Sequence, residues 1–152
     1  MVPLRAVRDL HAEDGDTVRV PIIGAALCAG FPSPADDFLE GDLGLPRWMA
    51  PNPPATFIWR VSGWSVVGAG IHDKDLIVID RSLTPIRDDI VVATIDGVNS
   101  LKRYRIVGNR PMLAFDNPDL PAEPLDEIGE AAIWGVASFN LRLLRPIGWG
   151  RR

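Results

Sequence analysis

The sequence predicts a mostly β protein: a compact, antiparallel, β-rich domain with a flexible N-terminal arm and one short helix. Two observations support this prediction. From Thr56 onward, short runs rich in β-branched and aromatic residues alternate with turn residues, which is the pattern of a compact antiparallel β domain. Before Thr56, proline and glycine recur between small apolar clusters, a composition that is typical of an extended arm.

The first element expected along the chain is a short helix over residues 33–39. Ser33 can cap its N-terminus, Pro34 suits the first helical position, and acidic residues follow in the first turn. The helix is expected to end near Gly41. We therefore divide the chain into an N-terminal arm over 1–29, a linker that holds this helix over 30–55 and a β-rich core over 56–152.

Six strands, separated by turns, are expected in the core. The dipeptide Asp96-Gly97 lies between two of them. It is a strong hairpin signal, because a two-residue turn requires positive φ, which Asp and Gly tolerate. The expected strands cover residues 56–62, 75–80, 89–95, 99–107, 112–115 and 131–144.

Composition and charge limit the classes of function. A formal net charge of −4 is poorly suited to binding nucleic acid through phosphate neutralisation, so tight direct binding to DNA is not expected. The single cysteine, Cys28, cannot form an internal disulfide, and two histidines leave no Cys/His set for a structural zinc site. No apolar run reaches the roughly 20 residues that span a bilayer, and the N-terminus lacks a signal-peptide core. We expect a cytoplasmic protein without membrane association, metal or cofactor.

Ser65 is a candidate nucleophile. It follows an expected strand and lies among small residues, with Gly63 before it and Gly68 after it. Glycines let the backbone turn sharply, so a serine here could present its Oγ beside backbone N–H groups that face a developing oxyanion. Other serine-enzyme signatures are missing, because the segment lacks the second glycine of a nucleophile elbow and the chain has no Ser-x-x-Lys. From the local pattern alone, a plain turn serine is the simpler interpretation.

Lys102 is the candidate base. In the expected strand Lys102 shares a face with Tyr104 and Ile106. Arg103 and Arg105 point to the other side. A lysine in apolar surroundings loses charge stabilisation, and its pKa can fall from about 10.4 toward roughly 7–8, where it can accept a proton from serine. A solvated strand lysine is the simpler interpretation when this strand is judged alone.

His72 is an alternative partner for Ser65 in a catalytic triad. It lies seven residues after Ser65, beside Asp73, Lys74 and Asp75. Without a spacing rule that favours a triad, we interpret His72 as a surface loop residue.

Three motifs occur in one order along the chain. The first is Ala29-Gly30-Phe31-Pro32-Ser33-Pro34-Ala35. The second is Ser62-Gly63-x-Ser65, followed by Gly70-Ile71 and Asp73-x-Asp75-Leu76-Ile77-Val78-Ile79-Asp80. The third is Asp88-Asp89-Ile90-Val91-Val92-Ala93, followed by Asp96-Gly97 and Lys102. In order and spacing they resemble the UmuD branch of the LexA-like S24 peptidases, and the match extends over about 22–144. The first motif, which is the most specific, resembles the family's cleavage segment.

The resemblance implies a serine endopeptidase that cleaves itself with a Ser–Lys dyad. By that resemblance Ser65 is the nucleophile, Lys102 is the general base, and the bond between Ala29 and Gly30 is the substrate. Alanine suits a narrow pocket on the acyl side, and glycine lets an intramolecular arm enter a tight cleft without a side-chain clash. The Pro/Gly-rich arm supplies the reach.

Two residues beside Ser65 depart from the family pattern. Trp64 stands where an acidic or polar residue is common, and Val66 stands where the family usually has methionine. Because an oxyanion hole uses backbone N–H groups, these side chains are not expected to change the cleavage chemistry. A bulky Trp64 is expected to alter the cleft or a partner surface, and with it the cleavage rate.

The resemblance also implies partners. Only 29 residues precede the expected cleavage bond, fewer than the helix-turn-helix module of a LexA-type repressor needs. A UmuD-like protein is therefore expected: a homodimer of the SOS response to DNA damage, whose self-cleavage is stimulated by a RecA–single-stranded-DNA filament. Its trimmed form, 30–152, would join a Y-family translesion polymerase.

Two alternatives stay open at this point. One is an interaction module of the same family that cleaves slowly or not at all, with Trp59 and Trp64 contributing to an interaction face. The other is a signal-peptidase-like enzyme that acts on other proteins. The lack of an expected membrane anchor counts against the second.

Overall fold

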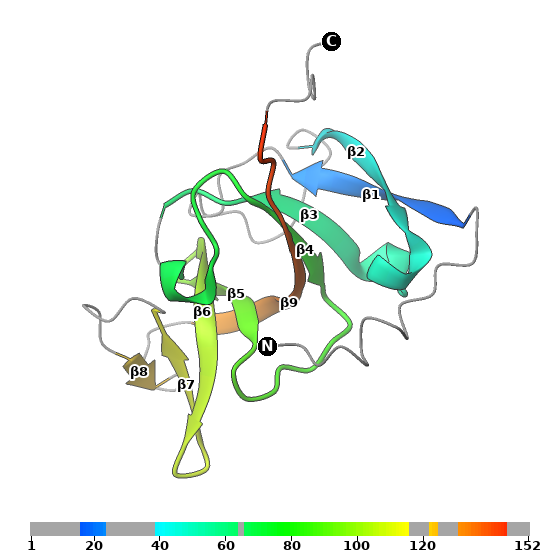
Figure 1. Ribbon diagram of the computed structural model, residues 1–152. Helices are drawn as coiled ribbons and strands as arrows, with labels where there is room; N and C mark the ends of the chain where they lie inside the picture. Colours follow the sequence, from blue (N-terminus) through cyan, green and yellow to red (C-terminus); the bar gives the residue numbers. More distant parts are fainter. Residues whose placement is uncertain (1–15, 24–38, 64–65, 116–121, 125–130, 146–152) are drawn as a thin grey trace, which may run out of the picture.

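A computed structural model describes residues 16–23, 39–63, 66–115, 122–124 and 131–145 of the chain. These residues form one nine-stranded sheet in the order β2-β1-β3-β4-β9-β5-β6-β7-β8. The sheet is strongly curved, with β1 and β2 at one end and β7 and β8 at the other (Figure 1). The strands are β1 (Thr17–Ile23), β2 (Leu39–Pro46), β3 (Thr56–Arg60), β4 (Leu76–Asp80), β5 (Ile90–Ile95), β6 (Val98–Val107), β7 (Arg110–Ala114), β8 (Ala122–Pro124) and β9 (Ala131–Leu141).

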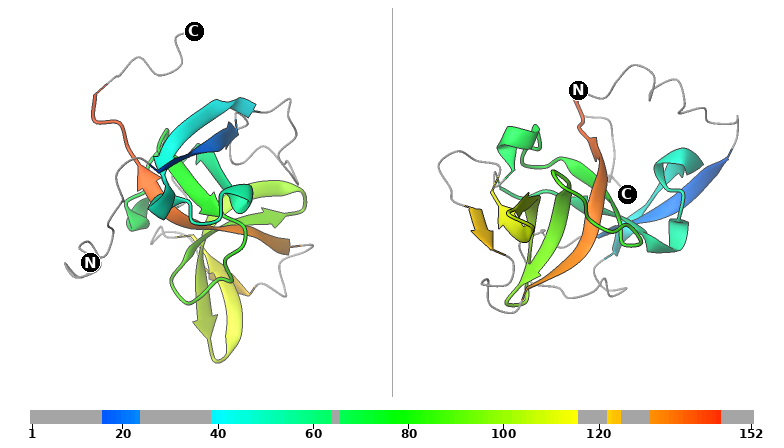
Figure 2. Two further views of the ribbon diagram at one scale, coloured as in Figure 1. Left: turned by 90° about the vertical axis from the view of Figure 1, so that its right-hand side faces the viewer. Right: turned by 90° about the horizontal axis from the view of Figure 1, so that it is seen from below.

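The predicted mostly β, antiparallel-rich architecture is confirmed. Neighbouring strands pair antiparallel throughout the described sheet, except β1 and β3, which pair parallel. The six expected strands correspond to β3, β4, β5, β6, β7 and β9, and the largest difference in a bound is three residues, at the end of β9. Two further views show that the β6–β7 hairpin and the β1–β2 pair lie at opposite ends of the molecule (Figure 2).

Both hairpins around β6 are made by residues with positive φ. Asp96 and Gly97 have φ of 50° and 80°, and they join β5 to β6 where Ile95 pairs with Val98. This confirms the hairpin predicted at Asp96-Gly97. Gly108 and Asn109 form a second turn of this kind between β6 and β7, with positive φ of 56° and 62°.

β1 is not among the strands predicted from the sequence, and it lies within the region assigned to the arm. In the folded sheet β1 alternates between buried and exposed side chains. Val18, Val20 and Ile23 are buried, and Thr17 and Arg19 are exposed. Pairing with β2 on one side and β3 on the other supplies the hydrogen bonds that hold it. β8 was also missed, because three residues are too few to show a pattern.

Part of the region interpreted as a linker with a short helix is the strand β2 instead. Residues 39–46 are a strand, although Gly41, Gly44 and Pro46 weaken any strand signal in the sequence. Leu39, placed at the end of the expected helix, begins this strand instead. The rest of the expected helix over 33–39 lies outside the described residues. In the described part, helical structure consists of the 3-10 turns η2 (Arg47–Met49), η3 (Pro53–Ala55) and η4 (Val67–Ala69).

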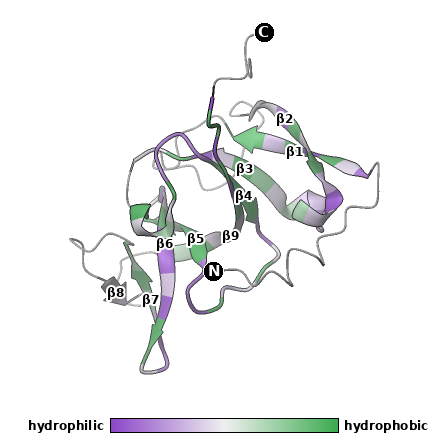
Figure 3. Cartoon of the chain, in the orientation of Figure 1, coloured by the Kyte–Doolittle hydropathy of each residue, from purple (hydrophilic) through white to green (hydrophobic). Residues whose placement is uncertain are grey.

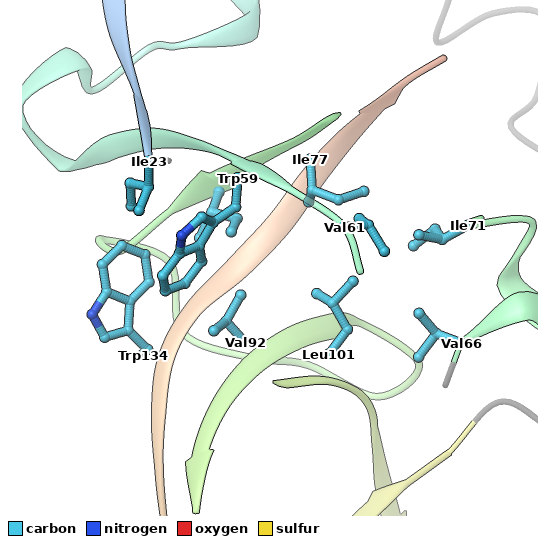
Figure 4. Packing of buried hydrophobic residues seen from close by; sticks show 10 residues of the cluster. Ile23, Trp59, Val61, Val66, Ile71, Ile77, Val92, Leu101 and Trp134 are labelled. Atoms are coloured by element: carbon cyan, nitrogen blue, oxygen red, sulfur yellow. The ribbon is translucent and has the colours of Figure 1, made fainter. Parts of the chain in front are cut away.

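Three clusters of buried side chains form the core. The first, which we call the tryptophan cluster, spans β1, β3, β4, β5, β6, β9 and the loop before β4 (Figure 4). The second lies between β1, β2, β3 and β4, and the third between β5, β7 and β9. The tryptophan cluster contains Ile23, Trp59, Val61, Val66, Ile71, Ile77, Ile79, Val92, Leu101 and Trp134.

A bulge in β9 places Trp134 in this cluster. The register skips Trp134, because Val92 pairs with Gly135 and Ala93 with Ile133. The rings of Trp134 and Trp59 are 4.7 Å apart. Trp59 is only 1% exposed, so the expectation that it contributes to an interaction face is wrong: its ring is a core side chain.

We predict that Gly135→Ala destabilises the fold. A Cβ at this position would lie 2.6 Å from Cγ2 of Ile79, and a buried branched side chain can move little, so the loss in free energy of unfolding should be roughly 1–3 kcal/mol. Urea denaturation measures it. Gly44→Ala is the matched control, because its Cβ would meet nothing nearer than an Arg19 side-chain atom at 4.0 Å. Equal loss in the two variants would contradict the clash.

Candidate active site

Lys102 lies in the middle of β6 and is 7% exposed. Its cross-strand neighbour on β5 is Val91, and Val91 in turn pairs with Val136 on β9. Both valines are buried members of the third cluster. The predicted burial of Lys102 is therefore confirmed, and its stem crosses an apolar face of the sheet.

The arginines that alternate with Lys102 lie on the opposite side, as expected. Arg103 donates to the carbonyl oxygen of Asp88 at 2.8 Å, and Arg105 forms an ion pair with the Asp88 carboxylate. Lys102, Arg103 and Arg105 give β6 its hydrophilic middle part (Figure 3). The Nζ of Lys102 lies instead 3.7 Å from the centre of the Phe115 ring.

Ser65 and Trp64 lie outside the described residues, whereas their chain neighbours Gly63 and Val66 are described. Gly63 has a φ of +94°, which favours glycine, and its N–H donates to Asp73 Oδ1 at 2.9 Å. Val66 is 1% exposed and belongs to the tryptophan cluster. The residues on either side of the Trp64-Ser65 dipeptide are therefore held by a hydrogen bond at Gly63 and by core packing at Val66.

The tryptophan cluster brings the two candidate segments together. Val66 follows Ser65 directly, Leu101 precedes Lys102 directly, and both side chains belong to this cluster. Figure 4 shows Leu101 and Val66 on the same side of it, with Ile71 beside Val66. The residues expected at the scissile bond, Ala29 and Gly30, lie outside the described residues.

A buried carboxylate holds the loop that follows Ser65. Asp75 is 3% exposed and accepts hydrogen bonds from the His72 N–H at 2.8 Å and from Asn140 Nδ2 at 3.0 Å. Arg142 donates to it through Nε at 2.8 Å and through a terminal nitrogen at 2.6 Å. The same terminal nitrogen of Arg142 donates to the carbonyl oxygen of Gly70 at 2.6 Å. Asn140 at the end of β9 and Arg142 just after it are therefore tied to the end of this loop at Asp75, and Arg142 is also tied to its middle at Gly70.

The hydrogen bonds to Asp75 shift its pKa. Burial raises the pKa of the carboxyl, but the hydrogen bonds from Arg142, His72 N–H and Asn140, with the charge of Arg142, outweigh that effect. The pKa of Asp75 therefore lies below its ordinary value. Its carboxylate form is favoured in the folded protein.

Sequence reasoning did not identify Arg142 or Phe115 as parts of this site. Arg142 is 67 residues from Asp75, and no local pattern indicates that contact. The position of Phe115 could have been predicted from the sequence, because a hairpin with its turn at Gly108 and Asn109 places residue 115 opposite residue 102. His72 lies in the turn before β4, as expected for a loop residue.

Two other classes of site are absent from the described part of the chain. It contains no group of three or more His, Cys, Asp or Glu side chains arranged to hold a metal ion. It also contains no helix with the length and apolar character needed to cross a membrane.

Comparison with known proteins gives similarities that cover most of the chain. The family model described as Peptidase S24-like matches residues 21–138. Protein ImpA of Salmonella typhimurium is 43% identical over 136 residues, which are 88% of this chain and 91% of ImpA. Protein MucA of Escherichia coli is 39% identical over 123 residues, 80% of this chain and 84% of MucA. The LexA repressor of Clostridium kluyveri is 36% identical over 112 residues, 74% of this chain and 55% of the repressor.

We predict that the contribution of Asp75 to stability disappears in acid. The pKa of Asp75 is lower in the folded than in the unfolded state, so the unfolded state binds the extra proton and stability rises with pH in that window. The stabilisation should be complete above the unfolded value of about 3.9 and be lost as pH falls through the folded value. The measurement is the free energy of unfolding against pH for the native chain and Asp75→Asn.

The two curves should converge as the pH falls below about 4. Asp42→Asn is the control, because its carboxylate pairs with Arg19 on an exposed surface. A constant gap between the native chain and Asp75→Asn down to about pH 2 would contradict the ionic contribution.

Proposed function

Because the chain belongs to the S24 peptidase family, in its UmuD-type branch, we propose that it is a self-cleaving serine endopeptidase with Ser65 as nucleophile and Lys102 as general base. The observation that carries the proposal is the burial of Lys102 on the apolar face formed with Val91 and Val136. Burial disfavours the ammonium relative to the neutral amine. A neutral amine can take the proton of a serine hydroxyl.

The reaction proceeds in two halves. Lys102 Nζ takes the proton of Ser65 Oγ as the oxygen attacks the carbonyl carbon of Ala29. The C–N bond to Gly30 then breaks, and its nitrogen leaves as an amine with the proton from Lys102. Lys102 then takes a proton from water, and the oxygen of that water attacks the carbonyl carbon of the resulting ester. The bond to Ser65 Oγ breaks, Oγ takes the proton back from Lys102, and the Ala29 carboxyl group is released and ionises.

The path of the chain supports cleavage of the Ala29–Gly30 bond by Ser65 of the same molecule. β1 ends at Ile23, which shares the tryptophan cluster with Val66 and Leu101. Ala29 follows six residues later, and six extended residues span at most about 20 Å. The segment that carries the expected scissile bond therefore starts from a strand end that packs in the same cluster as the residues next to Ser65 and Lys102.

The strand order suggests how cleavage could change the protein's surface. β1 lies between β2 and β3 in the sheet, and its Val18 and Val20 are part of the second buried cluster. A cut between Ala29 and Gly30 breaks the only covalent link from β1 to the residues that follow. Departure of β1 would uncover the edge of β3 and the apolar side chains beneath.

On the basis of its family, we further propose a place for the protein in the cytoplasmic SOS response to DNA damage. A RecA–single-stranded-DNA filament would stimulate self-cleavage of the homodimer. The trimmed form, 30–152, would then act as an accessory subunit of a Y-family, UmuC-like translesion polymerase. The net charge of −4 favours recruitment through protein contacts over tight binding to DNA by this chain itself.

We predict that incubation with the activated RecA filament yields a fragment that begins at Gly30, and that Ser65→Ala and Lys102→Ala each abolish it. Loss of the hydroxyl removes the nucleophile, and loss of the amine removes the base. Mass spectrometry and N-terminal sequencing identify the product. Lys74→Ala, which removes an exposed loop lysine, is the matched control and should cleave normally. A different stable terminus, or cleavage by Ser65→Ala, would refute the assignment.

We also predict that cleavage controls polymerase binding. The full-length Ser65→Ala chain retains β1 covalently, so it should bind the polymerase more weakly than the trimmed chain does. A pull-down of the cognate polymerase with the two forms, and with a trimmed Trp64→Ala form that tests the contact surface, measures the difference. Equal binding by full-length and trimmed chains would exclude a cleavage-controlled switch.

A further inference from the structure

The ring of Phe115 covers the amine of Lys102. The distance from Nζ to the ring centre is 3.7 Å, well within the roughly 6 Å over which an ammonium is attracted to the face of an aromatic ring. The contact follows from the register of the sheet. Arg103 on β6 pairs with Ala114 on β7, and one step further along the antiparallel ladder Lys102 stands opposite Phe115.

The strands around Lys102 supply apolar neighbours on this face. Val91 on β5, Val136 on β9 and Leu113 on β7 are each at most 3% exposed. A cation is poorly solvated in such surroundings, and the face of an aromatic ring partly replaces the lost water.

Titratable groups occur at one end of the same face. Tyr104 lies two residues further along β6, and its N–H donates to the carbonyl oxygen of Asp89 at 2.8 Å. The carboxylate of Asp89 accepts the N–H of Ile86 at 2.8 Å. The charges of Arg103 and Arg105 lie on the other side with Asp88. The Phe115 ring contacts Nζ directly, and its attraction differs between the two protonation states of the amine.

We propose that Phe115 is a positioning residue that holds Lys102 in its ammonium form and thereby restrains self-cleavage near neutral pH. This inference rests on the proposed role of Lys102 as the general base. The ring attracts the ammonium and has no comparable attraction for the neutral amine. Burial favours the neutral, working base, so Phe115 opposes the effect of burial. The balance between the two sets the pH at which cleavage accelerates.

The direct test is titration of Lys102 by NMR, with ¹³C-labelled lysine, in the full-length Ser65→Ala chain, which has no nucleophile. Phe115→Leu keeps an apolar side chain of similar size and removes the ring. The titration midpoint of Lys102 should fall by roughly one pH unit in Phe115→Leu. Phe115→Tyr keeps the ring and should leave the midpoint near its native position. An unchanged midpoint in Phe115→Leu would overturn the inference.

The kinetic test is the pH profile of uncatalysed self-cleavage. At pH near 7.5, Phe115→Leu should cleave roughly tenfold faster than the native chain, since one pH unit is a tenfold change in the neutral fraction. At high pH the two rates should meet, because Lys102 is then neutral in both. A purely structural role would instead lower the rate at every pH, and that result would overturn the proposal.

A matched control removes a ring elsewhere. Phe139 packs against Trp48 with ring centres 5.5 Å apart, in the second cluster. Phe139→Leu should leave both the Lys102 midpoint and the pH profile unchanged. If Phe139→Leu reproduces the effect of Phe115→Leu, the shift comes from general loosening and the inference fails.

Failure of this inference is distinguishable from failure of the proposed function. Persistent self-cleavage by Lys102→Ala would refute the role of Lys102 as base, whatever the NMR midpoint shows, and would remove the kinetic part of the inference with it. An inactive Lys102→Ala chain combined with an unmoved midpoint in Phe115→Leu would refute the inference alone.

Discussion

The buried carboxylate of Asp75 is the constraint on which the geometry around the candidate active site depends. A buried charge costs free energy unless hydrogen bonds and an opposite charge compensate it. Asp75 obtains both from two places: the loop before it, through His72 N–H, and the C-terminal end of β9 and the residue that follows it, through Asn140 and Arg142. Because Arg142 also binds the Gly70 carbonyl, the loop that follows Ser65 cannot shift without breaking this network.

Lys102 shows a different way to accommodate a buried ionisable side chain. It lies on an apolar face, and its amine contacts the ring of Phe115. Desolvation and the aromatic ring act in opposite directions on the protonation of this amine. Such opposed effects suit the proposed role of this amine as a general base, because small changes around it then alter the fraction that is neutral.

The position of β1 links the proposed chemistry to the proposed change of partners. A strand within a sheet has neighbours on both sides, so its removal exposes an edge on each of them. β1 is such a strand, placed between β2 and β3. One cut in the segment after Ile23 would therefore convert an internal strand into a separable peptide. Cleavage of a single peptide bond can in this way change the exposed surface at one end of the sheet.

The sequence by itself determined those features whose causes are local. Six strands, the turn at Asp96-Gly97 and the buried side of β6 follow from alternation and turn chemistry within a few residues, and the motifs around Ser65 and Lys102 indicated the family. Only the tertiary structure decided that β2 is a strand despite its glycines, that Trp59 is a core residue, and that Arg142 compensates Asp75. These features depend on which distant strands become neighbours and in what register. Pairing energy across the sheet then outweighs the weak preferences of each segment.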